Sequence, residues 1–245
     1  MKHLRIAFGL VVMAGLLAVA AAPAMALSPR WEQCKTVEIA NSGNWKDSLC
    51  SVPQGSGTWL TMQLTEKETE EVTSKSIGKI ELTDTKATGG ASTVACEGGD
   101  RGTIGANGAD QEIEVFATSC VRITGACTSN VRATAINLPW ITQLVEEPAG
   151  KIRNTLRSEI AGKSPGYVVE CSVQGIFTVE DECVGPISTA MSNLPNGNVL
   201  SEFDKKSEEE KESSTCKLGG PKSGIVKGKV EIQQKKNVAT YVNLR

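Results

Sequence analysis

Apolar and polar residues alternate in several short stretches of the chain. In residues 112–117, three apolar side chains fall on one face and two glutamates on the other. The same period of two recurs in residues 79–82, 167–174 and 226–233. Because successive side chains of a strand point to opposite faces, this pattern predicts antiparallel strands with one buried face. In the first stretch the predicted buried residues are Ile113, Val115 and Ala117, and the predicted exposed ones are Glu112 and Glu114.

Glycine pairs separate these stretches, for example Gly89–Gly90 and Gly219–Gly220. The glycine-rich segment 98–108 lacks the Lys-Ser/Thr of a phosphate-binding loop and is interpreted as a turn. Short strands separated in this way are typical of a sandwich or a barrel. The predicted fold is therefore all-β, a disulfide-stapled antiparallel β-sandwich or barrel-like structure.

Two segments depart from this period. Ile152, Leu156 and Ile160 are spaced four residues apart, which predicts one short helix within residues 151–161. Residues 201–214 place lysines beside glutamates with no apolar period, which predicts a solvent-exposed loop.

The first 26 residues, 1–26, have the features of a secretory signal peptide. Lys2 and Arg5 supply positive charge, residues 6–22 form an uncharged apolar run, and residues 24–26 (Ala-Met-Ala) match a cleavage site. The apolar run is shorter than the roughly 20 residues of a membrane-spanning helix. We therefore expect the leader to be cleaved and the protein to be secreted.

The mature chain is expected to form an amino-terminal β segment, 27–88, and a main β domain, 89–245, which could be one continuous domain. The whole chain has 26 basic and 28 acidic residues, and the leader carries two of the basic ones. Nucleic acids and anionic membranes require a basic stripe, which this acidic balance does not supply. We expect neither as a partner once the leader is removed.

All eight cysteines lie beyond the leader. In an exported protein an even number of cysteines predicts disulfide bonds. No Cys-x-x-Cys pair occurs, and the only histidine, His3, lies in the leader, so the pattern favours neither a zinc site nor a redox site. We expect no metal and no cofactor. The predicted disulfide cysteines are Cys34, Cys50, Cys96, Cys120, Cys127, Cys171, Cys183 and Cys216.

Removal of His3 also excludes His-dependent nucleophilic catalysis in the mature chain. Paired-carboxylate chemistry of the glycosidase kind remains, and it needs two acids about 5–10 Å apart. Residues 146–147 and 180–182 supply neighbouring acids, but neighbours in a strand point to opposite faces, so we interpret them as surface residues. The tryptophans could bind sugars if exposed, but we expect them in the core, because aromatics make up only 4% of the chain. The four tryptophans are Trp31, Trp45, Trp59 and Trp140.

Several short motifs contain or flank the cysteines. They are Leu27–Trp31 before Cys34, then Cys50, Val94–Cys96 with Gly102–Ile104, Phe116–Cys120 before Cys127–Ser129, and Val169–Cys171 before Gly185–Ile187. In this order they resemble a family of uncharacterised secreted proteins of soil actinobacteria. The resemblance implies an exported β-rich protein and carries no assigned activity. The chain departs from that family in Cys183 and Cys216, which look like an added pair.

Eight cysteines allow 105 pairings, and sequence alone leaves the connectivity partly open. Cys34 and Cys50 are expected to bond because they are close in sequence and precede the others, and the added pair is expected to bond together. For the remaining four we prefer Cys120–Cys127 with Cys96–Cys171, and the alternative is Cys96–Cys120 with Cys127–Cys171.

The function favoured by these observations is that of an exported, non-catalytic protein with a binding or structural role at the cell exterior. A glycan or an extracellular protein is the candidate partner. The alternative is a secreted carbohydrate-active enzyme that uses a carboxylate pair.

The predicted signal peptide and the even number of cysteines together lead to one testable prediction. The mature protein should begin at Leu27 and contain no free thiol. Intact-mass measurement before and after alkylation, without reduction, checks both statements. A retained leader, or a mass increase on alkylation, would contradict this interpretation.

Overall fold

The computed structural model describes residues 28–39, 41–203, 214–236 and 238–244. The predicted signal peptide and most of the predicted charged loop, residues 204–213, lie outside the described residues. The described chain consists of strands in two antiparallel sheets, with two short 3₁₀ turns and no α-helix. The predicted all-β fold is confirmed.

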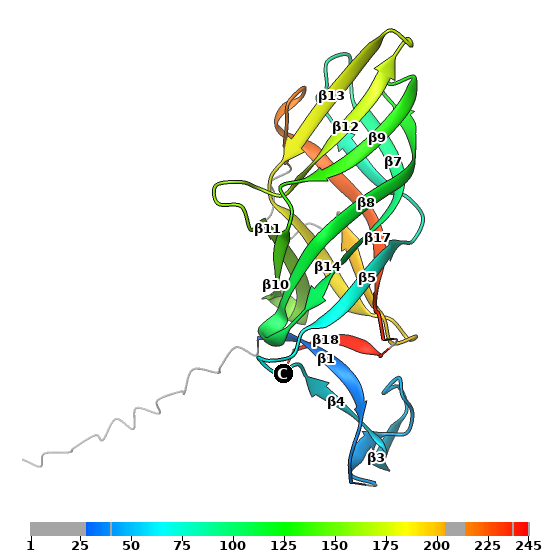
Figure 1. Cartoon of the computed structure of the whole chain (residues 1–245), viewed down its shortest axis with the longest axis vertical. Helices are drawn as coiled ribbons and strands as arrows, with labels where there is room; N and C mark the ends of the chain where they lie inside the picture. Colours follow the sequence, from blue (N-terminus) through cyan, green and yellow to red (C-terminus); the bar gives the residue numbers. More distant parts are fainter. Residues whose placement is uncertain (1–27, 40, 204–213, 237, 245) are drawn as a thin grey trace, which may run out of the picture.

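The smaller sheet brings both ends of the described chain together. Its strands lie in the order β18-β1-β4-β2-β3, and the last strand pairs with the first so that Val242 lies opposite Trp31. Figure 1 shows this sheet at one end of the molecule, below the main sheet. Its strands are β1 (Pro29–Thr36), β2 (Gly43–Trp45), β3 (Pro53–Gly57), β4 (Trp59–Gln63) and β18 (Thr240–Leu244).

The larger sheet closes on itself. From β15 its neighbours run β14, β11, β10, β8, β7, β5 and β17, and β17 pairs back onto β15 from Val199↔Ile232 to Phe203↔Gly228. We call this ring of eight strands the closed half. Its strands are β5 (Glu70–Ser76), β7 (Ser92–Ile104), β8 (Ala109–Thr124), β10 (Trp140–Glu147), β11 (Lys151–Ser158), β14 (Ile187–Asn193), β15 (Val199–Phe203) and β17 (Gly220–Gln234).

Three strands of this ring, β7, β8 and β17, extend beyond it into an open half. There β6 (Ile80–Asp84) takes the place of β5 between β7 and β17. The sheet continues from β17 through β16 (Ser214–Cys216), β13 (Phe177–Val184) and β12 (Gly166–Val173) to β9 (Ser129–Ile136). β9 and β8 are adjacent (Figure 1), yet within the described strands no backbone ladder joins them. The open half therefore keeps an unpaired seam between β8 and β9.

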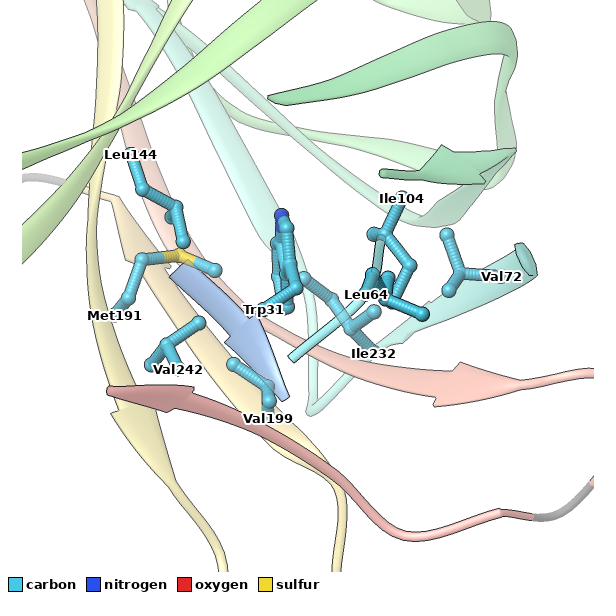
Figure 2. Close-up of a cluster of buried hydrophobic side chains, with 9 residues drawn as sticks. All are labelled: Trp31, Leu64, Val72, Ile104, Leu144, Met191, Val199, Ile232 and Val242. Carbon is cyan, nitrogen blue, oxygen red and sulfur yellow. The ribbon is translucent and has the colours of Figure 1, made fainter. Parts of the chain in front are cut away.

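The small sheet covers one end of the closed half with Trp31. This side chain is fully buried, and it shares one apolar cluster with residues of both sheets. Figure 2 shows its ring between Leu144 and Met191 on one side and Leu64, Ile104 and Ile232 on the other. Trp140 is also buried, so the core prediction is confirmed for these two tryptophans. Trp45 and Trp59 are half-buried and pack against the Cys34–Cys50 disulfide.

The predicted helix within 151–161 is wrong, because Lys151–Ser158 forms strand β11. A spacing of four residues fits both a helix face and every second inward position of a strand. Ile152, Asn154 and Leu156 occupy successive positions of one strand face, and the polar Asn154 concealed the alternation. Ile160 lies beyond the strand and is 45% exposed. The predicted loop 201–214 is also wrong at both ends, since residues 201–203 end β15 and Ser214 begins β16.

A β-bulge changes the predicted faces of β8. Gly102 pairs with Glu112 and Arg101 with Glu114, so Ile113 is the extra residue between two ladder positions. As a result Ile113 is 56% exposed, whereas Glu112 lines an interior cavity. The predicted positions of Glu112 and Ile113 are therefore both wrong, although Val115 and Ala117 do line the interior as predicted.

The predicted turn at 98–108 is confirmed only from Gly105 onward. Residues 98–104 belong to strand β7. There a Cβ atom on Gly99 would lie 2.1 Å from the Ser74 carbonyl oxygen, and one on Gly98 would lie 2.7 Å from the Phe116 carbonyl oxygen. These two glycines therefore permit close strand approach within the sheet.

All eight cysteines form disulfides. The predicted bonds Cys34–Cys50 and Cys183–Cys216 are confirmed. The preferred scheme for the other four is wrong, and the alternative holds, with Cys96 bonded to Cys120 and Cys127 to Cys171. The reason is that Cys120 lies on β8 beside its hairpin partner β7, which carries Cys96, whereas Cys127 lies in the loop that leads to β9, beside β12.

Replacement of Trp31 by alanine should destabilise the protein by about 3–5 kcal/mol, because the change leaves a cavity where the two sheets meet. Urea unfolding with the disulfides intact measures this loss. Ile176→Ala is the matched control, since Ile176 is 74% exposed and its loss should change stability by no more than about 0.5 kcal/mol. Equal unfolding midpoints for the two variants would contradict the packing role of Trp31.

Candidate functional site

A layer of polar side chains crosses the interior of the closed half. On four adjacent strands, the same order of inward residues recurs: one from the Trp31 cluster, one polar, and one from a second apolar cluster around Trp140. On β11, for example, Ile152, Asn154 and Leu156 follow this order. The four polar residues of these strands, each at most 5% exposed, are Thr142, Asn154, Thr189 and Ser201.

Acidic residues of β7 and β8 complete this layer. Asp100 exchanges two hydrogen bonds with Ser74 of β5: its carboxylate accepts from the serine hydroxyl, and its backbone N–H donates to the serine Oγ over 2.9 Å. Asp110 lies opposite Thr142, and its Oδ2 accepts from the Asn154 amide over 3.2 Å. Glu112, turned inward by the bulge, lies two residues further along β8. The polar layer thus comprises Ser74, Asp100, Asp110, Glu112, Thr142, Asn154, Thr189 and Ser201.

A cavity of about 120 Å³ adjoins the polar layer. Asp100, Glu112 and Asn154 line it on its polar side, and Trp140, Leu156 and Phe203 are among the side chains of its apolar wall. Within the described residues, no lysine or arginine lines it. The acids therefore face a largely apolar space without a basic partner.

This environment changes the protonation of all three acids. Burial raises the pKa of Asp100 to about 6. Burial also raises the pKa of Asp110 to about 7, and the neighbouring charge of Asp100 adds to the increase. The pKa of Glu112 lies well above its usual value because of burial and the charges of Asp100 and Asp110. Near neutral pH the three carboxyls are therefore partly protonated, and they can either donate hydrogen bonds or bind a cation.

Two buried side-chain oxygens of the layer, Thr142 Oγ1 and Asn154 Oδ1, have no hydrogen-bond partner in the described structure. Asn154 is 3% exposed, and its Nδ2 donates to Asp110, but its Oδ1 accepts no hydrogen bond within the described structure. Leaving a buried acceptor unpaired costs about 1–3 kcal/mol. Because Asn154 lines the cavity, a donor group placed there would recover that cost.

The unpaired seam contributes one wall of the cavity. Val115, Phe116 and Ala117 of β8 line it, together with Ala133 and Ala135 of β9. No backbone hydrogen bonds would have to break between these two described strands for them to separate. The seam is therefore a wall that no backbone ladder between these two strands holds closed.

The acids that the sequence suggested as a carboxylate pair do not form this site. Glu146 is exposed, and Glu147 lies 3.4 Å from the Arg153 guanidinium in an ion pair. Of residues 180–182, Asp181 lines a cavity, and that cavity is a different one. The cysteines form disulfides around the interior and leave no thiol for chemistry.

Sequence reasoning missed Asp100, Glu112 and Asn154, each for a local reason. Asp100 lay in the segment read as a turn, Glu112 precedes the bulge, and Asn154 lay in the segment read as a helix. A signal was present on β11, where an isolated polar residue stands between two apolar residues at a period of two. That signal becomes readable only once the strand is recognised.

Comparisons of the chain with protein-family models, with curated proteins and with solved structures find no match. In the described residues there is no helix with the length and apolar character needed to cross a bilayer.

The raised pKa values predict that thermal stability falls as the pH rises from 5 to 8. The folded state holds protons that the unfolded chain, with ordinary aspartate and glutamate pKa values, releases near pH 4. This stabilisation is complete below the unfolded pKa and is lost as the pH passes the folded values of about 6 and about 7. Carboxyls with lowered pKa values, such as Glu68, change their contribution to thermal stability only at lower pH.

Melting temperatures of the wild type and Asp110→Asn across this pH range check the prediction. The variant should lose less stability with rising pH, because it has one buried carboxyl fewer to ionise. Glu114→Gln, an exposed change on the same strand, should keep the wild-type slope. A wild-type slope in Asp110→Asn would refute the assignment.

Proposed function

We propose that this protein is an exported, non-catalytic binding protein that holds a small organic cation inside its closed sheet. The observation that carries the proposal is the group of three interior acids beside an apolar cavity without a basic partner. Burial of a charge without a partner is energetically unfavourable. Buried ionisable groups in proteins are therefore normally paired or neutral. A cationic ligand would supply the missing partner.

An organic cation fits this cavity better than a bare metal ion. In the described residues, no three acidic side chains of the polar layer bring carboxylate oxygens within 4.8 Å of one another. The apolar wall instead offers the aromatic rings of Trp140, Tyr167 and Phe203. Aromatic faces attract ammonium groups and also cover the apolar body of a ligand.

The size of the cavity limits the ligand. Its volume of about 120 Å³ is similar to the roughly 150 Å³ of an engineered cavity that binds benzene. It lies well below the about 300–1,000 Å³ of pockets for larger ligands. We therefore expect a ligand with about one ring or a short branched chain, with the ammonium group toward Asp100 and Glu112. The seam between β8 and β9 is the proposed route of access.

Export is the second part of the proposal. Four disulfides indicate an oxidising environment, in agreement with a secreted protein at the cell exterior. The predicted signal peptide and the resemblance to secreted actinobacterial proteins support the same location. The alternative of a carbohydrate-active enzyme stays a prediction that a chromogenic glycoside assay would decide.

Benzylamine and benzyl alcohol form a matched pair of probes, because they share a ring and differ in the charged group. At pH 8 benzylamine should bind the mature protein at least tenfold more tightly, since a charge-assisted hydrogen bond contributes about 1.5–3 kcal/mol. Calorimetry and the shift in melting temperature measure this difference. Binding should weaken as the pH falls to 5, because the acids become protonated.

Variants locate the binding site. Asp100→Asn should reduce benzylamine affinity about tenfold, whereas Glu114→Gln on the outer surface should leave it unchanged. Equal affinity for the alcohol and the amine would remove the cationic part of the proposal. Absence of binding by both probes to the wild type would overturn the proposal.

A further inference from the structure

A second cavity, of about 250 Å³, lies in the open half. Asp84 from the end of β6, Tyr167 from β12 and Asp181 from β13 line it. It also borders the disulfides of Cys171 and Cys183. Asp84, Tyr167 and Asp181 come from strands that the sheet brings together, although Asp84 is far from the other two in the sequence.

Asp84 supplies a buried oxygen without a partner. Its side chain is 4% exposed, and its Oδ1 accepts the Lys86 backbone N–H over 2.9 Å, but its Oδ2 has no hydrogen-bond partner in the described structure. Gly219 lies directly against this carboxylate, since a Cβ atom there would come within 2.0 Å of Oδ1. A side chain at this position would have to displace the Asp84 carboxylate.

Asp181 places a second carboxyl beside the first. Its Oδ1 accepts the Leu218 backbone N–H over 3.0 Å. Burial raises the pKa of Asp181, and the nearby Asp84 carboxyl adds to the increase. Neither acid forms an ion pair with a described lysine or arginine. The two acids thus lie close together without a positive charge between them.

Tyr167 is an independent sign that something polar is missing. It is 6% exposed, and its hydroxyl has no hydrogen-bond partner among the described residues although it borders the cavity. Burial and the charges of Asp181 and Asp84 raise its pKa, so the neutral hydroxyl can offer a lone pair at neutral pH. Tyr167 and Asp84, each with an unpaired side-chain oxygen, line the same cavity.

We propose that Asp84, Asp181 and Tyr167 form a binding site for an oxygen-ligated divalent cation of the calcium class. Two carboxylates balance the charge of one such ion. Calcium accepts 6–8 oxygen ligands in flexible geometry and completes its shell with water, for which this cavity has room. The sulfurs of Cys183 and Cys216 lie within 4.8 Å of an Asp181 oxygen, but they are bonded to each other, and only a thiolate is a metal ligand. The donor set is therefore one of hard oxygens.

This site lies in a different cavity from the proposed organic-cation site; Tyr167 borders both cavities, but Asp84 and Asp181 line only this one. The affinity expected for an extracellular module with few protein ligands is about 10⁻⁴–10⁻³ M. The ion would join β6, β12 and β13 at the level where the sheet has its unpaired seam. It would thus stabilise the open half without contact with the polar layer.

Melting curves of the mature protein with calcium chloride, against sodium chloride of equal ionic strength, test the proposal. Calcium at about 10 mM should raise the wild-type melting temperature, and Asp84→Asn should abolish that increase. Without calcium, Asp84→Asn should be at least as stable as the wild type, because it removes one of two adjacent like charges. This opposite effect separates loss of the ion from failure to fold.

Two further variants give the controls. Asp110→Asn alters only the polar layer and should keep the full response to calcium. Tyr167→Phe should remove the near-ultraviolet difference signal that calcium produces, because Tyr241 is the only other tyrosine of the chain. An unchanged wild-type melting temperature in calcium would overturn the proposal. A response that persists in Asp84→Asn and disappears in Asp110→Asn would also overturn it, because the ion would then bind to the polar layer.

Discussion

The pairing of β15 with β17 is the constraint on which the rest of this structure depends. By joining the two ends of an eight-stranded path, it turns one face of every strand into an enclosed interior. Each inward residue must then pack, pair or border a cavity, because no solvent face remains on that side. The small sheet closes one end of this interior with Trp31, and the second apolar cluster lies on the other side of the polar layer. Polar side chains that would be ordinary on an open sheet, such as Asn154 and Glu112, become buried groups with large energetic consequences.

The disulfides lie where this closure is absent. Three of the four are in the open half, where they join β7 to β8, the loop before β9 to β12, and β13 to β16. The fourth, Cys34–Cys50, holds the small sheet. In the closed half, the continuous ladder and the Trp31 cluster provide the cohesion, and the structure contains no disulfide there. None of these bonds crosses the seam between β8 and β9; they reinforce the strands on either side of it. The typical contribution of about 2–5 kcal/mol per disulfide is large against a total stability of about 5–15 kcal/mol.

The sequence was sufficient to predict several strands and two of the disulfides. It was not sufficient to predict which side chains face the interior, and the reasons can be identified. Alternation at 79–82, 167–174 and 226–233 predicted strands correctly, because side chains there follow the period of two without interruption. At Ile113 one extra residue reverses the faces, and a bulge leaves no mark in the pattern of apolar and polar residues. At Ile152 and Leu156, a spacing of four residues is compatible with both a helix and a strand. The site could not be predicted because closure depends on long-range pairing between β15 and β17, which no local pattern encodes.

Both cavities combine acids with unpaired buried oxygens, and this combination works against stability. The three acids of the polar layer and the pair Asp84–Asp181 place five buried or half-buried carboxyls in one small protein, and no basic side chain among the described residues lines either cavity. Hydrophobic residues of similar size would stabilise such positions by removing the cost of desolvation. A ligand that binds only the folded state adds stability in proportion to the logarithm of its concentration over its dissociation constant. Binding of the two proposed cations would therefore offset the destabilisation that both groups of acids cause. Without ligands, the Trp31 cluster and the disulfides keep the protein folded. Function and stability are then separated in this fold: apolar packing and covalent bonds maintain the interior, and the acids define what can occupy it.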